Sequence, residues 1–170
     1  MGRKKNKWFK KIVLFYRYVF KFEVPYKILV DGNMIAVSIQ KKFDLKESLM
    51  KTLDENVHLI IPSCVVHEIR TLENKIPGIL QTVLKYKIEE CTHGVMSPDN
   101  CIQSYIGKKN HFKYFVATQD KVLRYRLRKI AGTPSIFFDQ NMLLIDKPSK
   151  ASMEAYEKVQ YYINTFNHNI

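Results

Sequence analysis

The chain has 170 residues, the usual size of one domain, and 46% of them are hydrophobic, which is enough for a packed core. Its formal net charge of +12 predicts a polyanionic partner, either nucleic acid or an anionic membrane surface. Three cysteines, an odd number, argue against a secreted fold held by disulfides, and the longest uncharged stretch is too short to span a bilayer.

The first predicted element is an amphipathic helix over residues 7–22, within a basic N-terminal arm of residues 1–22. At 100° per residue, its apolar side chains fall on the side opposite its lysines. Such a helix can lie on a membrane surface, contact nucleic acid, or pack its apolar side on the domain and leave its lysines in water. No lipidation signal accompanies it, which weakens the membrane alternative. The basic candidates for nucleic-acid contacts here are Lys4, Lys5, Lys7, Lys10, Lys11 and Arg17.

Beyond Pro25, short apolar runs alternate with segments of helical spacing. Strands are predicted at 27–30, 58–61, 86–90, 113–118 and 135–138. Helices are predicted at 33–41, 45–54, 63–74, 77–85, 99–106, 119–130 and 150–166. This alternation predicts an α/β fold with three layers, α/β/α, in which helices cover both faces of a central, mostly parallel sheet. We expect the domain to span residues 23–148 and to be followed by a C-terminal helix and short tail over 149–170.

Acidic residues fall near the expected carboxyl ends of several strands, where reactive groups collect in parallel sheets. The four candidates are Asp31, Glu68, Asp99 and Asp120. A single acid in such a place is more often a helix cap or a turn residue. Several carboxylates gathered at one edge, however, repel one another unless a cation neutralises them, and Mg²⁺ or Mn²⁺ held there can activate water against a phosphodiester. The spacing is therefore compatible with a metal-dependent hydrolytic site.

A second basic run lies on the helix predicted directly after Asp120. It contains no acid, and its members are Lys121, Arg124, Arg126, Arg128 and Lys129. Basic groups in that place would offset phosphate repulsion close to the acidic candidates, and Tyr125 between them could stack on a base. The alternative is a solvated helix face.

A third group of candidates consists of Cys91, His93 and Cys101. Cysteine and histidine in such tight spacing suit tetrahedral Zn²⁺, but three ligands do not close a structural site. Cys64 and His67 complete the shell only if the fold brings them near. Cys64 is otherwise explained as a small buried residue between apolar neighbours.

Several ordered motifs together resemble one family. The segments are 24–32, 64–69 and 115–120, with the later segments 132–134 and 140–149. They are similar to the PIN-domain proteins of the small-subunit processome, and the later segments, together with Gln119, resemble the Utp23 type more than the related Fcf1 type. The resemblance covers residues 22–158, which is nearly the whole domain.

The resemblance implies a nucleolar protein of early small-subunit ribosome assembly. Such a protein binds pre-ribosomal RNA and an H/ACA small nucleolar RNA, works with other processome proteins in maturation of the small-subunit ribosomal RNA, and needs no membrane. In PIN nucleases three of the acids fall on Asp31, Glu68 and Asp120, whereas the third position in chain order is Asn100, beside Asp99. An asparagine lacks the charge that holds a second ion, so we expect a degenerate nuclease that binds RNA; the alternative is an active endoribonuclease dependent on Mg²⁺ or Mn²⁺.

The resemblance also implies a Cys-Cys-His-Cys zinc finger, in a Cys/His insert at 86–101. Cys91, His93 and Cys101 match three of its ligands, and the first cysteine is expected at the position of Tyr86. The sequence thus predicts an incomplete zinc site unless another group completes the shell.

Overall fold

The computed structural model of the chain describes residues 2–94 and 96–167. Within the first and last helices it leaves out the side chains of residues 2–6, 162, 163 and 165–167. The side chains of Lys4 and Lys5, both candidates for nucleic-acid contacts, therefore lie outside the described part.

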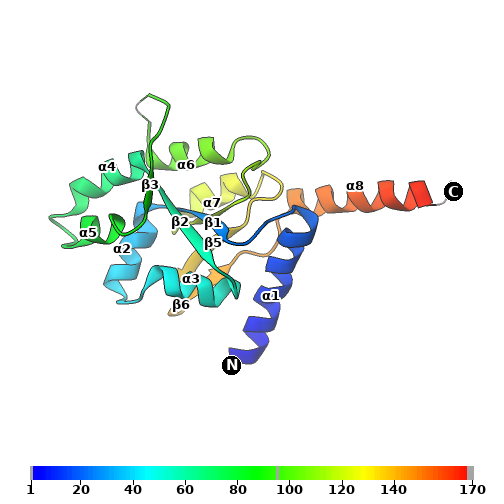
Figure 1. The fold of residues 1–170 in the computed structure, drawn as a ribbon, viewed down its shortest axis with the longest axis horizontal. Coiled ribbons are helices and arrows are strands. Elements are labelled where there is room, and N and C mark those ends of the chain that lie inside the picture. Colours follow the sequence, from blue (N-terminus) through cyan, green and yellow to red (C-terminus); the bar gives the residue numbers. More distant parts are fainter. Residues whose placement is uncertain (1, 95, 168–170) are drawn as a thin grey trace.

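One six-stranded sheet in the order β3-β2-β1-β4-β5-β6 forms the centre of the molecule (Figure 1). The strands are β1 (Tyr26–Val30), β2 (Val57–Pro62), β3 (Lys87–Glu89), β4 (Tyr114–Ala117), β5 (Ser135–Asp139) and β6 (Met142–Ile145). The helices are α1 (Gly2–Val19), α2 (Gly32–Gln40), α3 (Leu45–Leu53), α4 (Ser63–Leu72), α5 (Ile79–Val83), α6 (Pro98–Ile106), α7 (Lys121–Leu127) and α8 (Lys150–Asn167). The predicted α/β class and mostly parallel sheet are confirmed, since only the β5–β6 pair is antiparallel.

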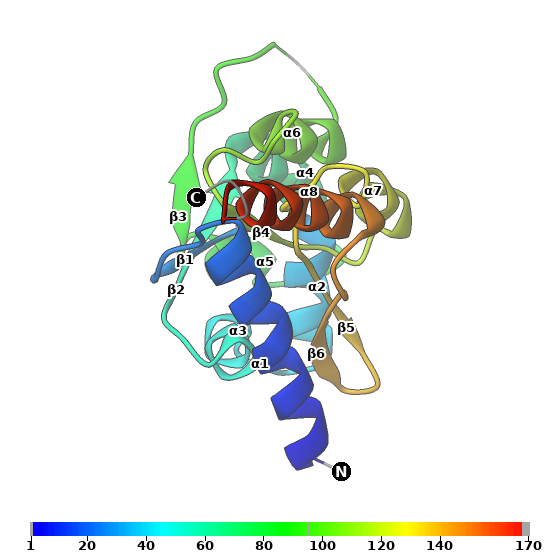
Figure 2. The ribbon, with the colours of Figure 1, turned by 90° about the vertical axis from the view of Figure 1, so that its right-hand side faces the viewer.

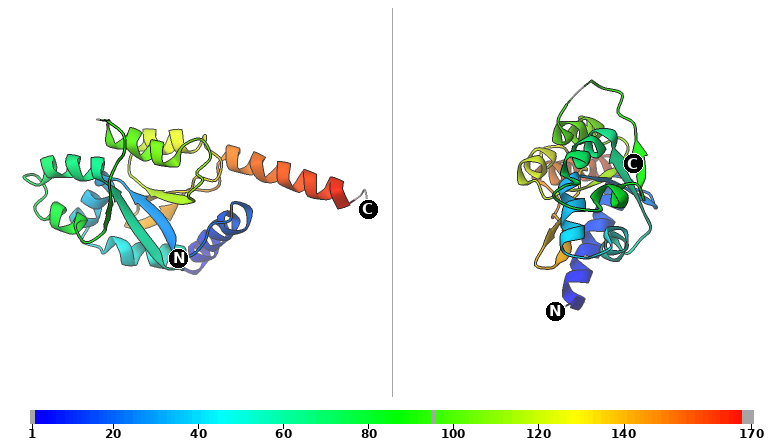
Figure 3. Two further views of the ribbon diagram at one scale, coloured as in Figure 1. Left: turned by 45° about the horizontal axis from the view of Figure 1, so that its top comes forward. Right: turned by 90° about the vertical axis from the view of Figure 1, so that its left-hand side faces the viewer.

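The helices form a layer on each side of the sheet. The connections from β1 to β2 to β3 carry α2 to α5, and the connections from β3 back to β4 and on to β5 carry α6 and α7. In the left view of Figure 3, α6 and α7 lie above the sheet, and α1 and α3 lie below it. The central strands β1, β2 and β4 are largely buried on both faces, and β4 is buried at all of its positions, whereas the edge strand β3 is buried at none.

Polar residues set the starts of several helices. Asp44 accepts a hydrogen bond from the backbone N–H of Glu47 (2.7 Å) at the start of α3, and Asp31 accepts one from Gly32 at the start of α2. The helix predicted over 77–85 is shorter than expected, because Gly78 has a left-handed φ of +83° and α5 begins only after it.

The strand β6 was not predicted. It pairs antiparallel with β5 through a two-residue turn at Gln140 and Asn141, whose φ angles are +48° and +62°. Positive φ at both central residues is the backbone of a type I′ hairpin, and asparagine tolerates it well. The turn signal at Asn141 was therefore present in the sequence. The apolar runs on either side of it, however, are too short for their periodicity to indicate a hairpin.

The helix α1 belongs to the same core as the domain. Its apolar side chains Phe9, Ile12, Val13 and Tyr16 are all buried, and α1 contacts α3 and β6. This is the alternative in which the arm packs its apolar side on the domain, so that side is not free to lie on a lipid surface. Among the described residues, no helix has the length and hydrophobicity that crossing a bilayer would require.

Close packing fixes the chain where α1 ends. Gly132 has a φ of +72°, and a Cβ at this residue would lie 2.6 Å from the ring of Phe20. The N–H of Gly132 donates to the buried hydroxyl of Ser152 in α8 (3.0 Å). Beyond these contacts α8 extends away from the domain (Figures 1 and 2).

Truncation of the buried side of α1 tests its place in the core. Replacing Ile12, which is 4% exposed, by alanine is expected to lower the free energy of unfolding by about 2–5 kcal/mol, because it leaves a cavity. Replacing Trp8, which is 45% exposed on the same helix, is expected to cost about 1 kcal/mol or less. Urea unfolding of both variants measures the difference, and equal small effects would show that α1 is not part of the core.

Candidate functional site

Asp31 lies at the carboxyl end of β1 and is only 5% exposed. Its Oδ1 accepts a hydrogen bond from the N–H of Gly32 (2.8 Å), and its Oδ2 accepts one from the hydroxyl of Thr118 (2.7 Å). Burial raises the pKa of Asp31 above its ordinary value, the two hydrogen bonds oppose that rise, and the charge of Asp120 adds to it. The carboxyl group is thus fixed in place and poorly solvated.

Asp120 stands three residues beyond the end of β4 and faces the same edge. Its N–H donates to the hydroxyl of Thr118 (3.0 Å), so this hydroxyl links the two carboxyl-bearing residues. The Oδ1 of Asp120 also accepts from the N–H groups of Val122 (2.7 Å) and Leu123 (3.1 Å). Asp120 is therefore the N-cap of α7 as well as a member of the acidic edge.

Glu68 reaches this edge from α4, one turn beyond the start of the helix. It lies beside Gly32, where an added Cβ would be 3.4 Å from its Oε2. Partial burial raises the pKa of Glu68, and the charges of Asp31 and Asp99 raise it further. Electrostatic interactions therefore connect the four predicted acids in series, Asp120 with Asp31, Asp31 with Glu68, and Glu68 with Asp99. Their roles in a reaction stay predictions.

Asp99 and Asn100 begin α6 and are both held by Arg126 of α7. One guanidinium nitrogen of Arg126 donates to Oδ1 of Asn100 (2.9 Å), and another forms an ion pair with Asp99. Hydrogen bonds from Ser97 and from Arg126 lower the pKa of Asp99. The cation beside Asp99 is thus supplied by the chain itself.

The other arginines of the second basic run also have internal partners. Arg124 forms an ion pair with Asp146 (3.4 Å) and lies over the ring of Phe137 (3.9 Å from the centroid). Arg128 donates to the carbonyl oxygen of Lys147 (3.2 Å) and lies near Asp146. By contrast, Lys121 and Lys129 are exposed. The run predicted as one basic face is therefore divided into a partnered part and an exposed part.

The described basic side chains of the arm are exposed, and α1, which carries them, lies at some distance from α4, α6 and α7 (Figure 1). Lys10 forms an ion pair with Asp54 (3.3 Å) and Arg17 forms one with Glu55 (3.0 Å). Lys7 and Lys11 are exposed as well. Contacts between any of these residues and nucleic acid stay predictions.

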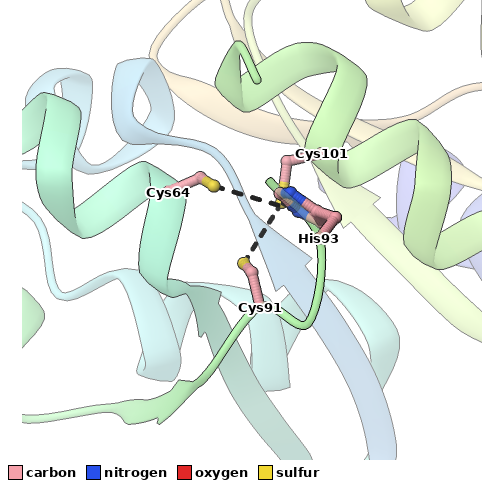
Figure 4. Close-up of side chains that lie close together, drawn as sticks. All are labelled: Cys64, Cys91, His93 and Cys101. Carbon is pink, nitrogen blue, oxygen red and sulfur yellow. Dashed lines mark hydrogen bonds between the residues drawn. The ribbon is translucent and has the colours of Figure 1, made fainter. Parts of the chain in front are cut away.

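A cluster of three cysteines and one histidine lies between α4, α6 and the segment after β3 (Figure 4). Its members are Cys64, Cys91, His93 and Cys101, and their ligand atoms all lie within 4.8 Å of one another. The Sγ atoms of Cys91 and Cys101 are 3.4 Å apart, and Nε2 of His93 is 3.1 Å from Cys101 Sγ and 3.9 Å from Cys64 Sγ. Among the described residues this is the one group of three or more such side chains placed closely enough to hold a metal ion.

The geometry of this cluster suits a tetrahedral ion. Zinc–sulfur bonds of about 2.3 Å and zinc–nitrogen bonds of about 2.0 Å place tetrahedral ligand atoms roughly 3.5–3.8 Å apart. Three separations in the cluster, of 3.1, 3.4 and 3.9 Å, bracket that value, and all of the ligand atoms lie within 4.8 Å of one another. The Nδ1 of His93 lies 2.6 Å from the carbonyl oxygen of Gly94, so an Nδ1–H that donates there leaves Nε2 as the ligand atom.

The thiols of the cluster differ in acidity. Burial opposes ionisation of Cys91, but hydrogen bonds involving Ser63, the backbone of Cys64 and Cys101 outweigh it and lower the pKa of Cys91 to about 6. Burial raises the pKa of Cys101, and the neighbouring Cys91 raises it further. One thiolate is therefore available at neutral pH before any ion binds, and a metal ion would displace the protons of the others.

Tyr86, the position at which the resemblance places the first cysteine, is not part of the cluster. Tyr86 packs against the core beside β3, whereas Cys64 in the first turn of α4 completes the group. Of the two substitutes considered from the sequence, the fold brings in Cys64 and not His67, which lines an open groove of about 500 Å³ next to the cluster. The cluster has four members, so Cys64 is the additional group that could complete the shell.

Sequence analysis also missed Thr118 and Asn33, which organise the acidic edge. The Oδ1 of Asn33 accepts from the N–H of Gln119 (2.9 Å), and the amide group of Gln119 both donates to and accepts from the backbone of Phe138. These neutral residues carry no sequence signal of their own. Only their places directly after β1 and β4 would have indicated them.

Comparison with known proteins agrees with this geometry. Residues 51–147 match the model of the Fcf1 family. The chain belongs to the Fcf1 family. It is also 35% identical over 136 residues to the human rRNA-processing protein FCF1 homolog, an alignment that covers 79% of this chain and 68% of that protein.

Two further similarities of this Fcf1-family chain are to a Utp23 protein and to a solved structure. It is 28% identical over 157 residues to the rRNA-processing protein utp23 of Schizosaccharomyces pombe, covering 90% of this chain but only 60% of the length of that protein. The solved structure of the PIN domain endonuclease Utp24 superposes with a TM-score of 0.68 at 30% identity, over 74% of this chain and 95% of that one. The predicted PIN-type fold is therefore confirmed.

Burial of Asp31 has a consequence for stability. Because its pKa is raised on folding, the folded chain holds this proton more tightly than the unfolded chain, so the stability it contributes is present at acid pH and is lost as the pH rises through the folded pKa. Asp31→Asn is therefore expected to raise Tm at neutral pH. The gain should shrink as the pH falls towards about 4, the ordinary aspartate value.

Thermal unfolding across this pH range measures the effect. Asp139→Asn, at an exposed position on β5, is the matched control for the loss of one negative charge. A gain in Tm of the Asp31 variant that does not depend on pH, or no gain at all, would contradict the assignment.

Proposed function

We propose that this protein is a ribosome-biogenesis factor of the small-subunit processome, and that it binds pre-ribosomal RNA and an H/ACA small nucleolar RNA in the nucleolus. The proposal is supported by membership of the Fcf1 family, by relatives named as rRNA-processing proteins, and by a net charge of +12. Its part is maturation of the small-subunit ribosomal RNA, together with other processome proteins.

Within this function the chain binds RNA rather than cleaving it. The observation that carries this choice is the fork that Arg126 makes with Asn100 and Asp99. The position expected to carry an acid is neutral, and the neighbouring acid already has an internal cation. Three acids remain, and one of them, Asp31, is buried with its oxygens engaged by Gly32 and Thr118. This arrangement favours a degenerate nuclease site over one that recruits two divalent ions.

The alternative function is an endoribonuclease dependent on Mg²⁺ or Mn²⁺. It is favoured by the charges of Glu68 and Asp120, which both act on Asp31 at one sheet edge, and by the likeness to the PIN domain endonuclease Utp24. Under this alternative the carboxylates would hold a divalent ion, which supplies an activated water.

We also propose that the ion of the Cys/His cluster is zinc. The donor set of three sulfur atoms and one imidazole nitrogen is the one that structural zinc sites use, and the four side chains leave no ligand position open. Cys64 comes from α4 and Cys101 from α6, so the ion would fasten these two helices to the segment that carries Cys91 and His93.

A cleavage assay separates the two functions. Wild-type protein with single-stranded RNA and Mn²⁺ is expected to show no cutting above that of Asp31→Asn. Asn100→Asp, which restores the missing charge, is expected to increase metal-dependent cutting or Mn²⁺ binding relative to wild type. Cutting by the wild type that Asp31→Asn abolishes would establish the endoribonuclease instead.

Crosslinking in cells tests the RNA partners. Ultraviolet crosslinking followed by sequencing is expected to recover pre-ribosomal RNA and an H/ACA small nucleolar RNA. Recovery of neither at more than the background of an untagged strain would exclude the proposed function, whatever the cleavage assay shows.

Metal analysis tests the zinc centre. Purified protein is expected to contain one zinc per chain, and Cys64→Ser is expected to lose most of it and to lower Tm, because metal binding and folding are coupled. Tyr86→Phe is the matched control at the position first expected to supply the ligand, and it should keep its zinc. Full zinc content in Cys64→Ser would exclude Cys64 as a ligand.

A further inference from the structure

The outward side of α7 exposes two large apolar side chains. Val122 is 64% exposed and Tyr125 is 63% exposed, although both belong to a helix whose Leu123 and Leu127 are fully buried. They lie three residues apart and therefore on one side of the helix. Exposure of this kind is not required for packing, since the buried side of α7 already anchors it to the sheet.

Cations stand at both ends of this apolar surface. Lys121 lies one helical turn before Tyr125, and the ammonium group of Lys129 lies 4.7 Å from the centroid of the Tyr125 ring. From residue 121 to residue 138 the sequence contains no Asp or Glu. The surface of Lys121, Val122, Tyr125 and Lys129, here called the α7 platform, is therefore apolar in the middle and positive at its ends.

The arginines of the same helix do not contribute to this surface. Arg124 and Arg126 are engaged with Asp146 and with Asp99, on the inner side of α7. Of the residues in the basic run that were predicted to contact phosphates, Lys121 and Lys129 therefore remain available. The α7 platform is smaller than the basic face that the sequence indicated.

The α7 platform lies next to the acidic edge. Asp120 caps the first turn of α7, so Lys121 and Val122 directly follow a member of that edge. We propose that the α7 platform binds single-stranded RNA by stacking a base on Tyr125 while Lys121 and Lys129 contact the flanking phosphates. This inference rests on the proposed RNA-binding function, and it names the surface and the form of RNA that the surface takes.

Charge and shape select this occupant. Among the described residues Lys121 and Lys129 have no ion-pair partner, which favours a polyanion, and an aromatic ring offers a base the face that a single strand leaves open. In a duplex the faces of the bases are already stacked on one another, so Tyr125 would have nothing to stack on. Double-stranded RNA is therefore expected to depend on the lysines alone.

Fluorescence anisotropy with a short labelled single-stranded RNA tests the platform. Tyr125→Ala is expected to raise Kd roughly tenfold, the effect of losing one stacked base, whereas Tyr125→Phe keeps the ring and should stay near wild type. The dependence of log Kd on log salt should not change in Tyr125→Ala. In Lys121→Ala its slope should fall by about 0.7, because one phosphate contact is lost.

Two comparisons make the test specific. Phe112, also 63% exposed and flanked by basic residues, lies before β4, at the opposite end of the strand from Asp120, so Phe112→Ala is the matched control and should bind normally. Binding of a duplex should not respond to Tyr125→Ala. Unchanged Tm in each variant confirms that the fold is intact.

The possible failures are distinguishable. If the wild type binds no RNA of any form, the proposed function fails and the platform with it. If the wild type binds single-stranded RNA but Tyr125→Ala binds equally well, the platform alone is wrong. A loss in Phe112→Ala with none in Tyr125→Ala would place the RNA at the other end of the sheet and overturn the inference.

Discussion

The parallel alignment of β1, β2 and β4 is the constraint on which the candidate sites depend. Because these strands run in the same direction, their carboxyl ends meet at one edge, and the residues that follow them are Asp31, Ser63 and Thr118. The helices that begin there carry Glu68 and Asp120 towards the same place. A shift in the pairing of β4 by one residue would move Thr118 away from Asp31 and break the hydrogen bond that joins the two halves of the acidic edge.

The helix α4 serves two centres at once. Cys64 and Glu68 are one turn apart on it, so one end of the helix contributes a sulfur atom to the Cys/His cluster and the next turn contributes a carboxylate to the acidic edge. The helix α6 also carries a member of each centre, Asp99 and Cys101, which are two residues apart and so point to different sides of the helix. The two helices contact each other, and each has a residue in the cluster. The placement of the acids is therefore mechanically tied to the cluster, although the two centres have different chemistry.

Much of the fold and of the two candidate centres could be predicted from the sequence, for reasons that differ between residues. The buried strands have continuous apolar runs, Asp31 directly follows β1, and Asp120 lies three residues after β4, so periodicity and strand order were sufficient. The fourth member of the Cys/His cluster could not be found by counting along the chain, because Cys64 is 27 residues before Cys91 and only the β2–β3 crossover brings them together. The internal pairing of Arg124 and Arg126 also depends on tertiary contacts, since helical spacing alone does not say which side of α7 is covered.

The packing of α1 into the core fixes the positions of Lys7 and Lys11 relative to the domain. An arm on a flexible linker could follow a ligand, but Lys7 and Lys11 are carried on a helix whose opposite side is buried with Ile12 and Tyr16. A polyanion that touches both this helix and the surface near Asp120 must pass around the domain. When one nucleic-acid strand makes two weak contacts, the first contact raises the effective concentration of the strand at the second site. This gain is negligible until the nucleic acid is long enough to span both sites. The overall affinity would then increase sharply once the ligand is long enough to reach both surfaces. Because α1 is docked rigidly on the domain, the distance between the two surfaces sets this threshold length.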